Sequence, residues 1–273
     1  MKEDEFRQFM IFLLNYGNIV VELSRLLNTK FMTKEDFEKP IGRALKDIFH
    51  CHNARLYPFR DYELARLTML MKHLQHIERY DPMLLQKFRE KINRSDSDYY
   101  GFRFEVAIAS SLIKKGVHFT YPNPPDFRIA YDGSTICIEC TSRHVSQDKY
   151  HKPLDIVLEI KRAINRKSRR RYDIPRCALF IDVTNLYYLA QLKGQINQLR
   201  SIKESIREVL EKESNFGSIL LFVYIMNKDK NRFEFNYIRM DNKKIDQTLK
   251  DFLDKFYPIG KYGVLNFVIP ERG

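Results

Sequence analysis

A short hairpin near the middle of the chain places the tightest constraint on its fold. Two apolar runs, Asp126–Tyr131 and Thr135–Thr141, alternate in the manner of strands and are separated by Asp132-Gly133. An Asp-Gly pair favours the two-residue turn that joins antiparallel strands. Pro124-Pro125 precedes the first run and restricts where that strand begins. The pattern therefore predicts a hairpin whose strands belong to the core.

This hairpin carries two acids in apolar surroundings. Asp126 stands at the start of the first strand, and Glu139 lies within the second. Because successive side chains of a strand point to opposite faces, Glu139 shares its face with Cys137 and Thr141. A buried carboxylate is costly unless a partner or a metal compensates it. Two carboxylates at one end of a hairpin suit a hard divalent cation bound through oxygen.

A third acid, Glu105, lies on a helix predicted from about Asp98 to Lys115. Polar residues at 95–98 can cap its start, and Gly116 favours its end. Glu105 falls on the same side as the apolar stripe, where its charge needs compensation. An alternative stays open, in which Glu105 is a boundary residue paired with a lysine. The stripe consists of Phe102, Val106, Ala109 and Ile113.

The order of these motifs resembles that of the PD-(D/E)XK nuclease superfamily, which has the restriction-endonuclease-like fold. Its pattern is a glutamate on a helix, then Pro-Asp, then Glu-x-Lys. Gly101–Glu105 resembles the first helix of that core, Pro125-Asp126 its second motif and Ile138–Thr141 its third. The chain departs from the pattern at Thr141, where the superfamily usually has lysine. The resemblance covers roughly residues 99–183.

The resemblance implies a metal-dependent phosphodiesterase that cleaves nucleic acid, and we expect a DNA endonuclease. Asp126 and Glu139 would ligate Mg²⁺ or Mn²⁺, the carbonyl of Cys140 would be a third ligand, and Glu105 would complete the shell directly or through water. The metal would lower the pKa of a bound water and stabilise the pentavalent phosphate. Two alternatives stay open: an RNase, and a degenerate member that binds nucleic acid without cleaving it, because Thr141 cannot carry a charge.

A cation from elsewhere must replace the missing lysine if the enzyme cleaves. In several members of the superfamily the lysine lies instead on the helix that follows the hairpin, and this chain looks similar to them. That helix is predicted here from about Lys152 to Arg171. Lys167 continues the apolar row of that helix, so we expect it to face the sheet and the acids. Lys161 lies on an adjacent row and is the second candidate. The apolar row consists of Val157, Ile160 and Ile164.

The positive charge of the chain is concentrated in its second part. The net charge is +12, of which residues 1–98 supply +2 (17 basic minus 15 acidic) and the rest +10 (30 minus 20). A basic surface beside a carboxylate site suits a polyanionic substrate. We therefore expect phosphate contacts from the cluster after the hairpin, although a solvated helix end is the alternative. The candidates are Arg143, Arg169, Arg170 and Arg171.

The domain organisation follows from the same patterns. Residues 1–97 show amphipathic helical periodicity and a nearly neutral charge, which favours a helical region for dimerisation, regulation or DNA recognition, with a homodimer as one expectation. Residues 98–273 alternate strands and helices, which predicts an α/β domain with a mixed sheet flanked by helices. Its further predicted elements are strands at 177–183, 217–226, 232–240 and 264–269, and helices at 186–213 and 244–256.

The N-terminal sequence and the cysteines bear on location. The chain begins Met1-Lys-Glu-Asp-Glu, which is too acidic for a signal peptide. Four cysteines without a secretory signal are typical of a reducing compartment. By inspection, no apolar run approaches the length of a membrane helix. We therefore expect a cytoplasmic protein that does not contact a membrane.

Overall fold

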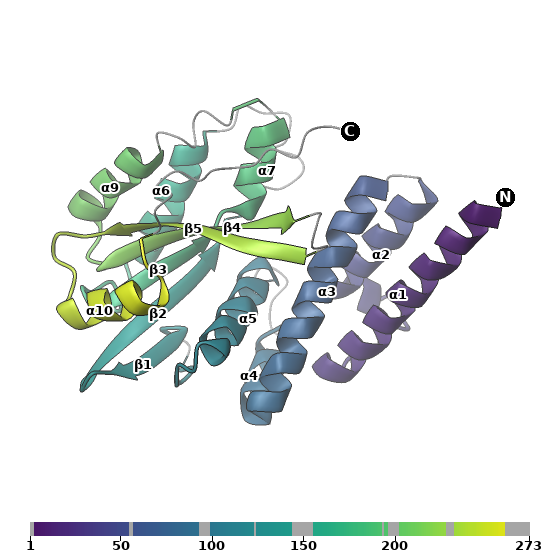
Figure 1. The fold of residues 1–273 in the computed structure, drawn as a ribbon, viewed down its shortest axis with the longest axis horizontal. Helices are drawn as coiled ribbons and strands as arrows, with labels where there is room; N and C mark the ends of the chain where they lie inside the picture. Colours follow the sequence, from purple (N-terminus) through teal and green to yellow (C-terminus); the bar gives the residue numbers. More distant parts are fainter. Residues whose placement is uncertain are drawn as a thin grey trace. The chain divides into compact units, whose positions relative to one another are not determined.

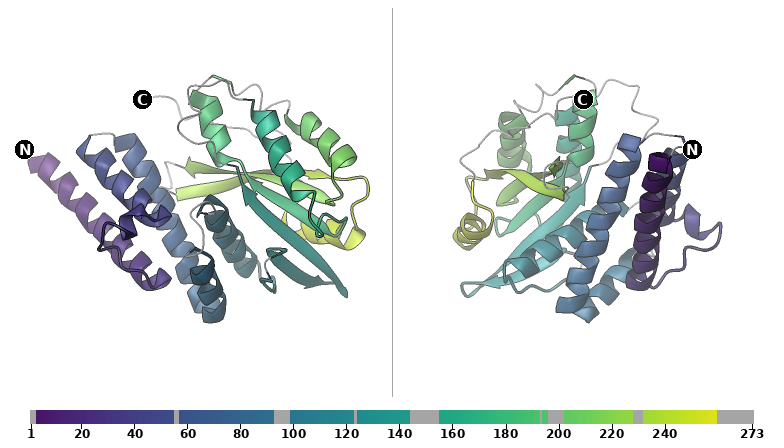
Figure 2. Two further views of the ribbon diagram at one scale, coloured as in Figure 1. Left: turned by 180° about the vertical axis from the view of Figure 1, so that it is seen from behind. Right: turned by 45° about the vertical axis from the view of Figure 1, so that its right-hand side comes forward.

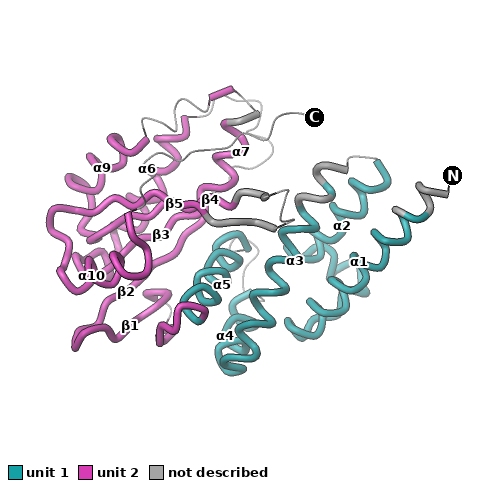
Figure 3. Tube along the Cα trace, in the orientation of Figure 1, with its two compact units in different colours: residues 1–113 teal, residues 114–273 magenta. Residues whose placement is uncertain are grey.

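The computed structural model divides the chain into two compact units, residues 1–113 and 114–273 (Figure 3). The division falls in the last turn of the helix that carries Glu105, whereas the sequence placed the domain boundary at residues 97 and 98, before that helix. The structure describes residues 3–54, 57–92, 99–122, 124–143, 155–192, 194–195, 202–227 and 232–259.

The first unit is helical among its described residues (Figure 1). Local signals set some helix starts. The Asp81 carboxylate accepts the backbone amides of Met83 (2.9 Å) and Leu84 (3.1 Å), and Pro82 occupies the first turn, as the sequence predicts. The elements are α1 (Glu3–Leu27), the short 3-10 helix η1 (Asp36–Glu38), α2 (Pro40–Asn53), α3 (Tyr57–Tyr80), α4 (Pro82–Ile92) and α5 (Tyr99–Lys114). The role of this unit in dimerisation, regulation or DNA recognition stays a prediction.

Helix α1 corrects one sequence expectation. Phe9–Leu27 is long and apolar enough to cross a membrane, so the statement that no segment approaches this length was wrong. A core helix of a soluble protein passes the same test, and α1 contacts α3 while burying Leu23 and Leu26 completely. One such helix does not indicate a membrane protein.

The second unit contains a five-stranded mixed sheet in the order β1-β2-β3-β4-β5. The outer pairs are antiparallel, and the two inner pairs are parallel. The hairpin turn has the positive φ angles that the Asp-Gly pair predicts, 46° at Asp132 and 72° at Gly133. The strands are β1 (Phe127–Tyr131), β2 (Ser134–Ser142), β3 (Cys177–Asp182), β4 (Ser218–Asn227) and β5 (Arg232–Asp241).

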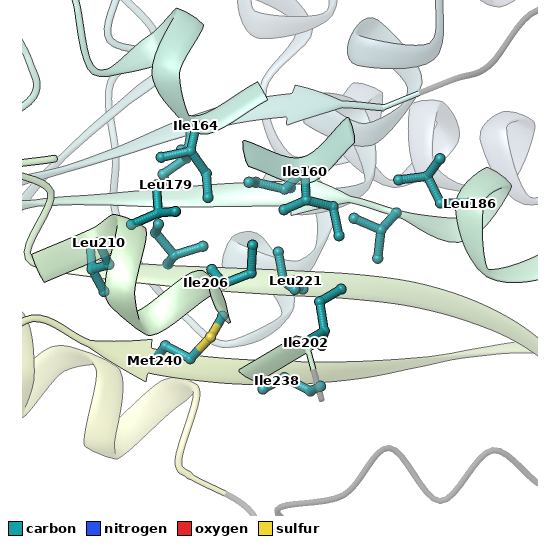
Figure 4. Close-up of a cluster of buried hydrophobic side chains, with 14 of the residues drawn as sticks. Ile160, Ile164, Leu179, Leu186, Ile202, Ile206, Leu210, Leu221, Ile238 and Met240 are labelled. Atoms are coloured by element: carbon teal, nitrogen blue, oxygen red, sulfur yellow. The ribbon is translucent and has the colours of Figure 1, made fainter. Parts of the chain in front are cut away.

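Helices cover both faces of this sheet (Figure 2). Three of them, α6 (Ile156–Lys167), α7 (Thr184–Leu192) and α9 (Ile202–Glu213), bury aliphatic side chains against one face (Figure 4). On the other face, Phe180 and Phe222 contact Tyr257, which follows α10 (Gln247–Phe256). The predicted α/β class, with a mixed sheet flanked by helices and an N-terminal helical region, is confirmed.

Some predicted elements differ from the structure. The single helix at 186–213 is wrong, because Gly194 adopts a left-handed φ of 66° and separates α7 from α9. Helix α6 ends at Lys167 instead of Arg171, and the chain then turns. The predicted strand at 264–269 lies outside the described residues.

Candidate active site

Asp126 and Glu139 lie against each other at the open end of the hairpin. The register pairs Phe127 with Ile138, so the residue before β1 comes opposite Glu139. The backbone N–H of Asp126 donates to Glu139 Oε2 (3.3 Å), and the backbone N–H of Cys140 donates to Asp126 Oδ2 (2.7 Å). The two acids are only 3% and 2% exposed. The structure thus brings together the two acids that the hairpin pattern singled out.

Lys167 supplies a cation to this acid pair. It is the last residue of α6, one turn beyond the buried Ile164, and its Nζ forms an ion pair with Glu139 Oε1. The Lys167 side chain is 20% exposed, so it lies between the buried acid and solvent. Lys161 is placed beside α9, where its charge adds to the larger effect of Lys212 in lowering the pKa of Glu208. Of the two candidates, the structure brings Lys167 to the acids.

Tyr172 also contacts Glu139, and the sequence prediction missed it. Its phenol donates to Glu139 Oε1 (2.9 Å), the oxygen that also pairs with Lys167. Burial raises the pKa of Tyr172, and the negative charge of Glu139 raises it further. The sequence feature that could have indicated this contact is the position of Tyr172 at the end of the basic segment that starts at Lys167.

Thr141, at the position of the missing lysine, is hydrogen-bonded to an arginine. Arg166 Nη2 donates to Thr141 Oγ1 (3.1 Å), while Thr141 is buried and the Arg166 side chain remains largely exposed. The guanidinium therefore lies beside the Thr141 hydroxyl. Sequence reasoning missed Arg166, because the helical rows pointed to Lys167 and Lys161.

The role of Cys140 as a ligand stays a prediction. The structure shows its backbone N–H bonded to Asp126, which fixes the strand backbone against that carboxylate. Its side chain is buried and is not part of a disulfide. The sequence predicted the Cys140 carbonyl as the ligand. The hydrogen bond of the Cys140 amide places the backbone of this residue next to the acid pair.

The four arginines proposed for nucleic acid binding are in two different environments. Arg143 forms an ion pair with Glu159, a residue that also pairs with Arg162 (2.7 Å). The other three follow α6 in a turn and are exposed. These exposed residues are Arg169, Arg170 and Arg171.

Glu105 belongs to the first unit, where it is 5% exposed. Lys91 Nζ lies 2.5 Å from Glu105 Oε2, which agrees with the alternative of a glutamate paired with a lysine. The two side chains are mostly buried, and a charge in such a place needs its partner. The predicted part of Glu105 in a metal site stays a prediction.

This ion pair predicts a stability effect. Lys91→Met should lower the free energy of unfolding by about 3 kcal/mol, because it leaves the Glu105 carboxylate without its lysine. The double variant Lys91→Met/Glu105→Leu should regain most of that loss, since no buried charge is left unpaired. Urea unfolding of both variants measures the effect. Equal stability of Lys91→Met and the wild type would contradict a structural role for the pair.

The acid pair fits a hard divalent cation. The carboxylates of Asp126 and Glu139 and the ammonium of Lys167 together carry a formal charge of −1. Because the two acids are buried, a further positive charge beside them is favourable. Mg²⁺ is commonly bound through one or two carboxylates and several waters. Within the part of the chain that the structure describes, no group of three or more His, Cys, Asp or Glu side chains is arranged around a metal position. The fit therefore depends on Asp126 and Glu139 together with water or backbone oxygen.

Comparisons of the chain with protein-family models, with curated proteins and with solved structures gave no match. The functional conclusion therefore depends on the residues and contacts described above.

Proposed function

We propose that this chain is a metal-dependent phosphodiesterase of the PD-(D/E)XK type, with a restriction-endonuclease-like core, that acts as a DNA endonuclease. The observation that carries the proposal is the acid pair: Asp126 and Glu139 are joined through backbone N–H groups at the end of a hairpin, with the Lys167 ammonium on Glu139. The order of the elements also supports it, because a helix, the hairpin, α6 and β3 follow one another as the motif order implies.

Each residue of the site has a role in this proposal. Asp126 and Glu139 would hold Mg²⁺ or Mn²⁺, which would activate a water and offset charge on the phosphate. Lys167 would orient the attacking water or offset charge on the leaving group, in place of the lysine absent at Thr141. Arg166, which is exposed and hydrogen-bonded to Thr141, would contact a phosphate next to the acids.

A cleavage assay tests the proposal. Purified protein is incubated with supercoiled plasmid, and separately with RNA, in the presence of Mg²⁺, Mn²⁺ or EDTA. We expect nicked and linear DNA with either metal and intact plasmid in EDTA. Cleavage of RNA alone would identify an RNase. Binding of DNA without cleavage under all metal conditions would overturn the enzymatic proposal.

One observation favours the second candidate function, a nuclease-fold module that binds nucleic acid without cleaving it. Glu139 Oε1 already has two partners in the protein, Lys167 and Tyr172, so its charge is compensated by side chains alone. Such a site would be stable with no metal bound. The binding module predicts equal DNA affinity with Mg²⁺ and with EDTA, whereas a metal-loaded enzyme site should bind phosphate more tightly with the metal.

The exposed arginines predict the salt dependence of binding. Each phosphate contact on duplex DNA contributes about −0.9 to the slope of log affinity against log salt concentration. Replacing Arg169, Arg170 and Arg171 together with alanine should therefore make the slope shallower by up to about 2.7. Fluorescence anisotropy of labelled duplex DNA across a salt series measures this slope.

A matched variant controls for the loss of three charges. Lys212, Lys243 and Lys244 are exposed on or near α9 and α10. Two of them already pair with acids of the protein, Lys212 with Glu208 (2.7 Å) and Lys243 with Glu211 (2.9 Å). Replacing these three lysines with alanine removes the same charge and should change the slope by much less. Equal slopes for the two triple variants would mean that Arg169, Arg170 and Arg171 are solvated surface residues that do not contact phosphate.

A further inference from the structure

The two oxygens of Glu139 have different partners. Oε1 accepts from both Lys167 and Tyr172, whereas Oε2 accepts from the backbone N–H of Asp126. We propose that Tyr172 is a positioning residue that holds Oε1 and thereby directs Oε2 toward Asp126, where the two carboxylates can share one divalent cation. This inference rests on the metal site of the proposed function.

The phenol is suited to this task in a way that the ammonium is not. A lysine carries a compact charge on a flexible four-carbon stem and imposes little direction on its acceptor. The Tyr172 hydroxyl is carried by a rigid ring, which is half-buried and contacts the fully buried Phe216 (ring centroids 6.3 Å apart). The ring thus fixes the direction from which Oε1 is approached, and with it the plane of the carboxylate.

The backbone around Tyr172 is also fixed. The turn after α6 is closed by hydrogen bonds from Arg170 N–H to the Lys167 carbonyl (3.1 Å) and from Asp173 N–H to the Arg170 carbonyl (3.0 Å). The buried Asp173 carboxylate accepts the backbone N–H of Asn215 (2.8 Å) and the hydroxyl of Ser214 (3.1 Å). Tyr172 therefore lies between a closed turn and a residue held by the segment before β4.

Outer hydrogen bonds of this kind set the geometry of metal-binding carboxylates, and their loss typically weakens metal affinity by about 10- to 100-fold. Glu139 without the phenol would keep its charge and its contact with Lys167. It would lose the donor that is carried by a rigid ring, and with it part of the restriction on its rotation. The expected result is a weaker site with an unchanged number of ligands, which separates positioning from ligation.

The test compares two tyrosines that each donate a hydrogen bond in the second unit. Tyr172→Phe removes the bond to Glu139, and Tyr188→Phe removes a bond to the Tyr224 carbonyl (3.3 Å). Free and bound Mn²⁺ are measured by electron paramagnetic resonance, and the melting temperature is measured in EDTA. Tyr172→Phe should raise the Mn²⁺ dissociation constant by about tenfold with little change in melting temperature, and Tyr188→Phe should leave the constant unchanged.

The outcomes separate this inference from the proposed function. Equal Mn²⁺ affinity of Tyr172→Phe and the wild type would overturn the positioning role, even if the wild type cleaves DNA. Suppose that the wild type binds Mn²⁺ but cleaves nothing. Weaker Mn²⁺ binding by Tyr172→Phe would then support the positioning role, while the lack of cleavage would overturn the enzymatic proposal. A wild type that binds no Mn²⁺ would overturn both.

Discussion

Asp126→Asn and Glu139→Gln should each lower metal-dependent cleavage by about a thousandfold or more. The metal is expected to supply several kcal/mol of transition-state stabilisation, and each 1.4 kcal/mol corresponds to about a tenfold change in rate. An amide is a much poorer ligand for a hard cation than a carboxylate, although it keeps the shape and one acceptor oxygen. Plasmid cleavage at saturating Mg²⁺, with DNA affinity measured separately, gives the effect on the chemical step.

An acid outside the site provides the control. Asp246→Asn changes the carboxylate that caps α10 by accepting the backbone N–H groups of Thr248 (3.0 Å) and Leu249 (3.4 Å), and it should leave cleavage within a few-fold of the wild type. Both site variants should remain folded in EDTA, because the Lys167 side chain next to Glu139 is 20% exposed and can turn toward water. Full cleavage by either folded site variant would remove the catalytic assignment from the acid pair.

Lys167→Met should lower cleavage by about 100- to 1,000-fold, the usual effect of removing one preorganised positive or hydrogen-bonding group from a reaction site. The methionine keeps most of the apolar stem that extends from the end of α6. Lys161→Met is the matched control on the same helix, and it should cleave normally, because Lys161 lies beside α9. Assays at saturating Mn²⁺ keep differences in metal affinity from obscuring the comparison.

Two outcomes would contradict the assignment of Lys167. Normal cleavage by Lys167→Met together with loss of cleavage in Lys161→Met would transfer the role to Lys161. Normal cleavage by both variants would exclude a lysine on α6. Arg166, which is hydrogen-bonded to Thr141, would then be the next cation to examine, followed by Arg143 in its ion pair with Glu159.

The contacts that sequence predicts well are those set by short-range rules. The Asp132-Gly133 turn fixes the hairpin register, and the register places Asp126 opposite Glu139. Strand alternation then places Thr141 on the same face as Glu139. The helical row of α6 directs Lys167 to that face. Each step needs only a local pattern and one pairing.

The contacts that sequence missed arise where such patterns end. Tyr172 follows the end of α6, so no helical row predicts its direction. Gly194 interrupts an apolar periodicity that continues on both sides of it, so the pattern alone predicted one long helix. The Lys91 partner of Glu105 comes from a neighbouring helix, and a single sequence gives no signal for that pairing.

If the proposed function holds, the turn from Lys167 to Tyr172 links the binding of the metal to the binding of nucleic acid. Both of its end residues contact the same oxygen of Glu139, and the three exposed arginines lie between them. With Glu139 as a metal ligand and the arginines on phosphate, a cation that changes the position of Glu139 also changes the geometry of the phosphate contacts. Thermodynamic linkage is reciprocal, so nucleic acid would raise the affinity for the cation by the same factor by which the cation raises the affinity for nucleic acid. A nuclease built in this way would load its metal most strongly when its substrate is already in place.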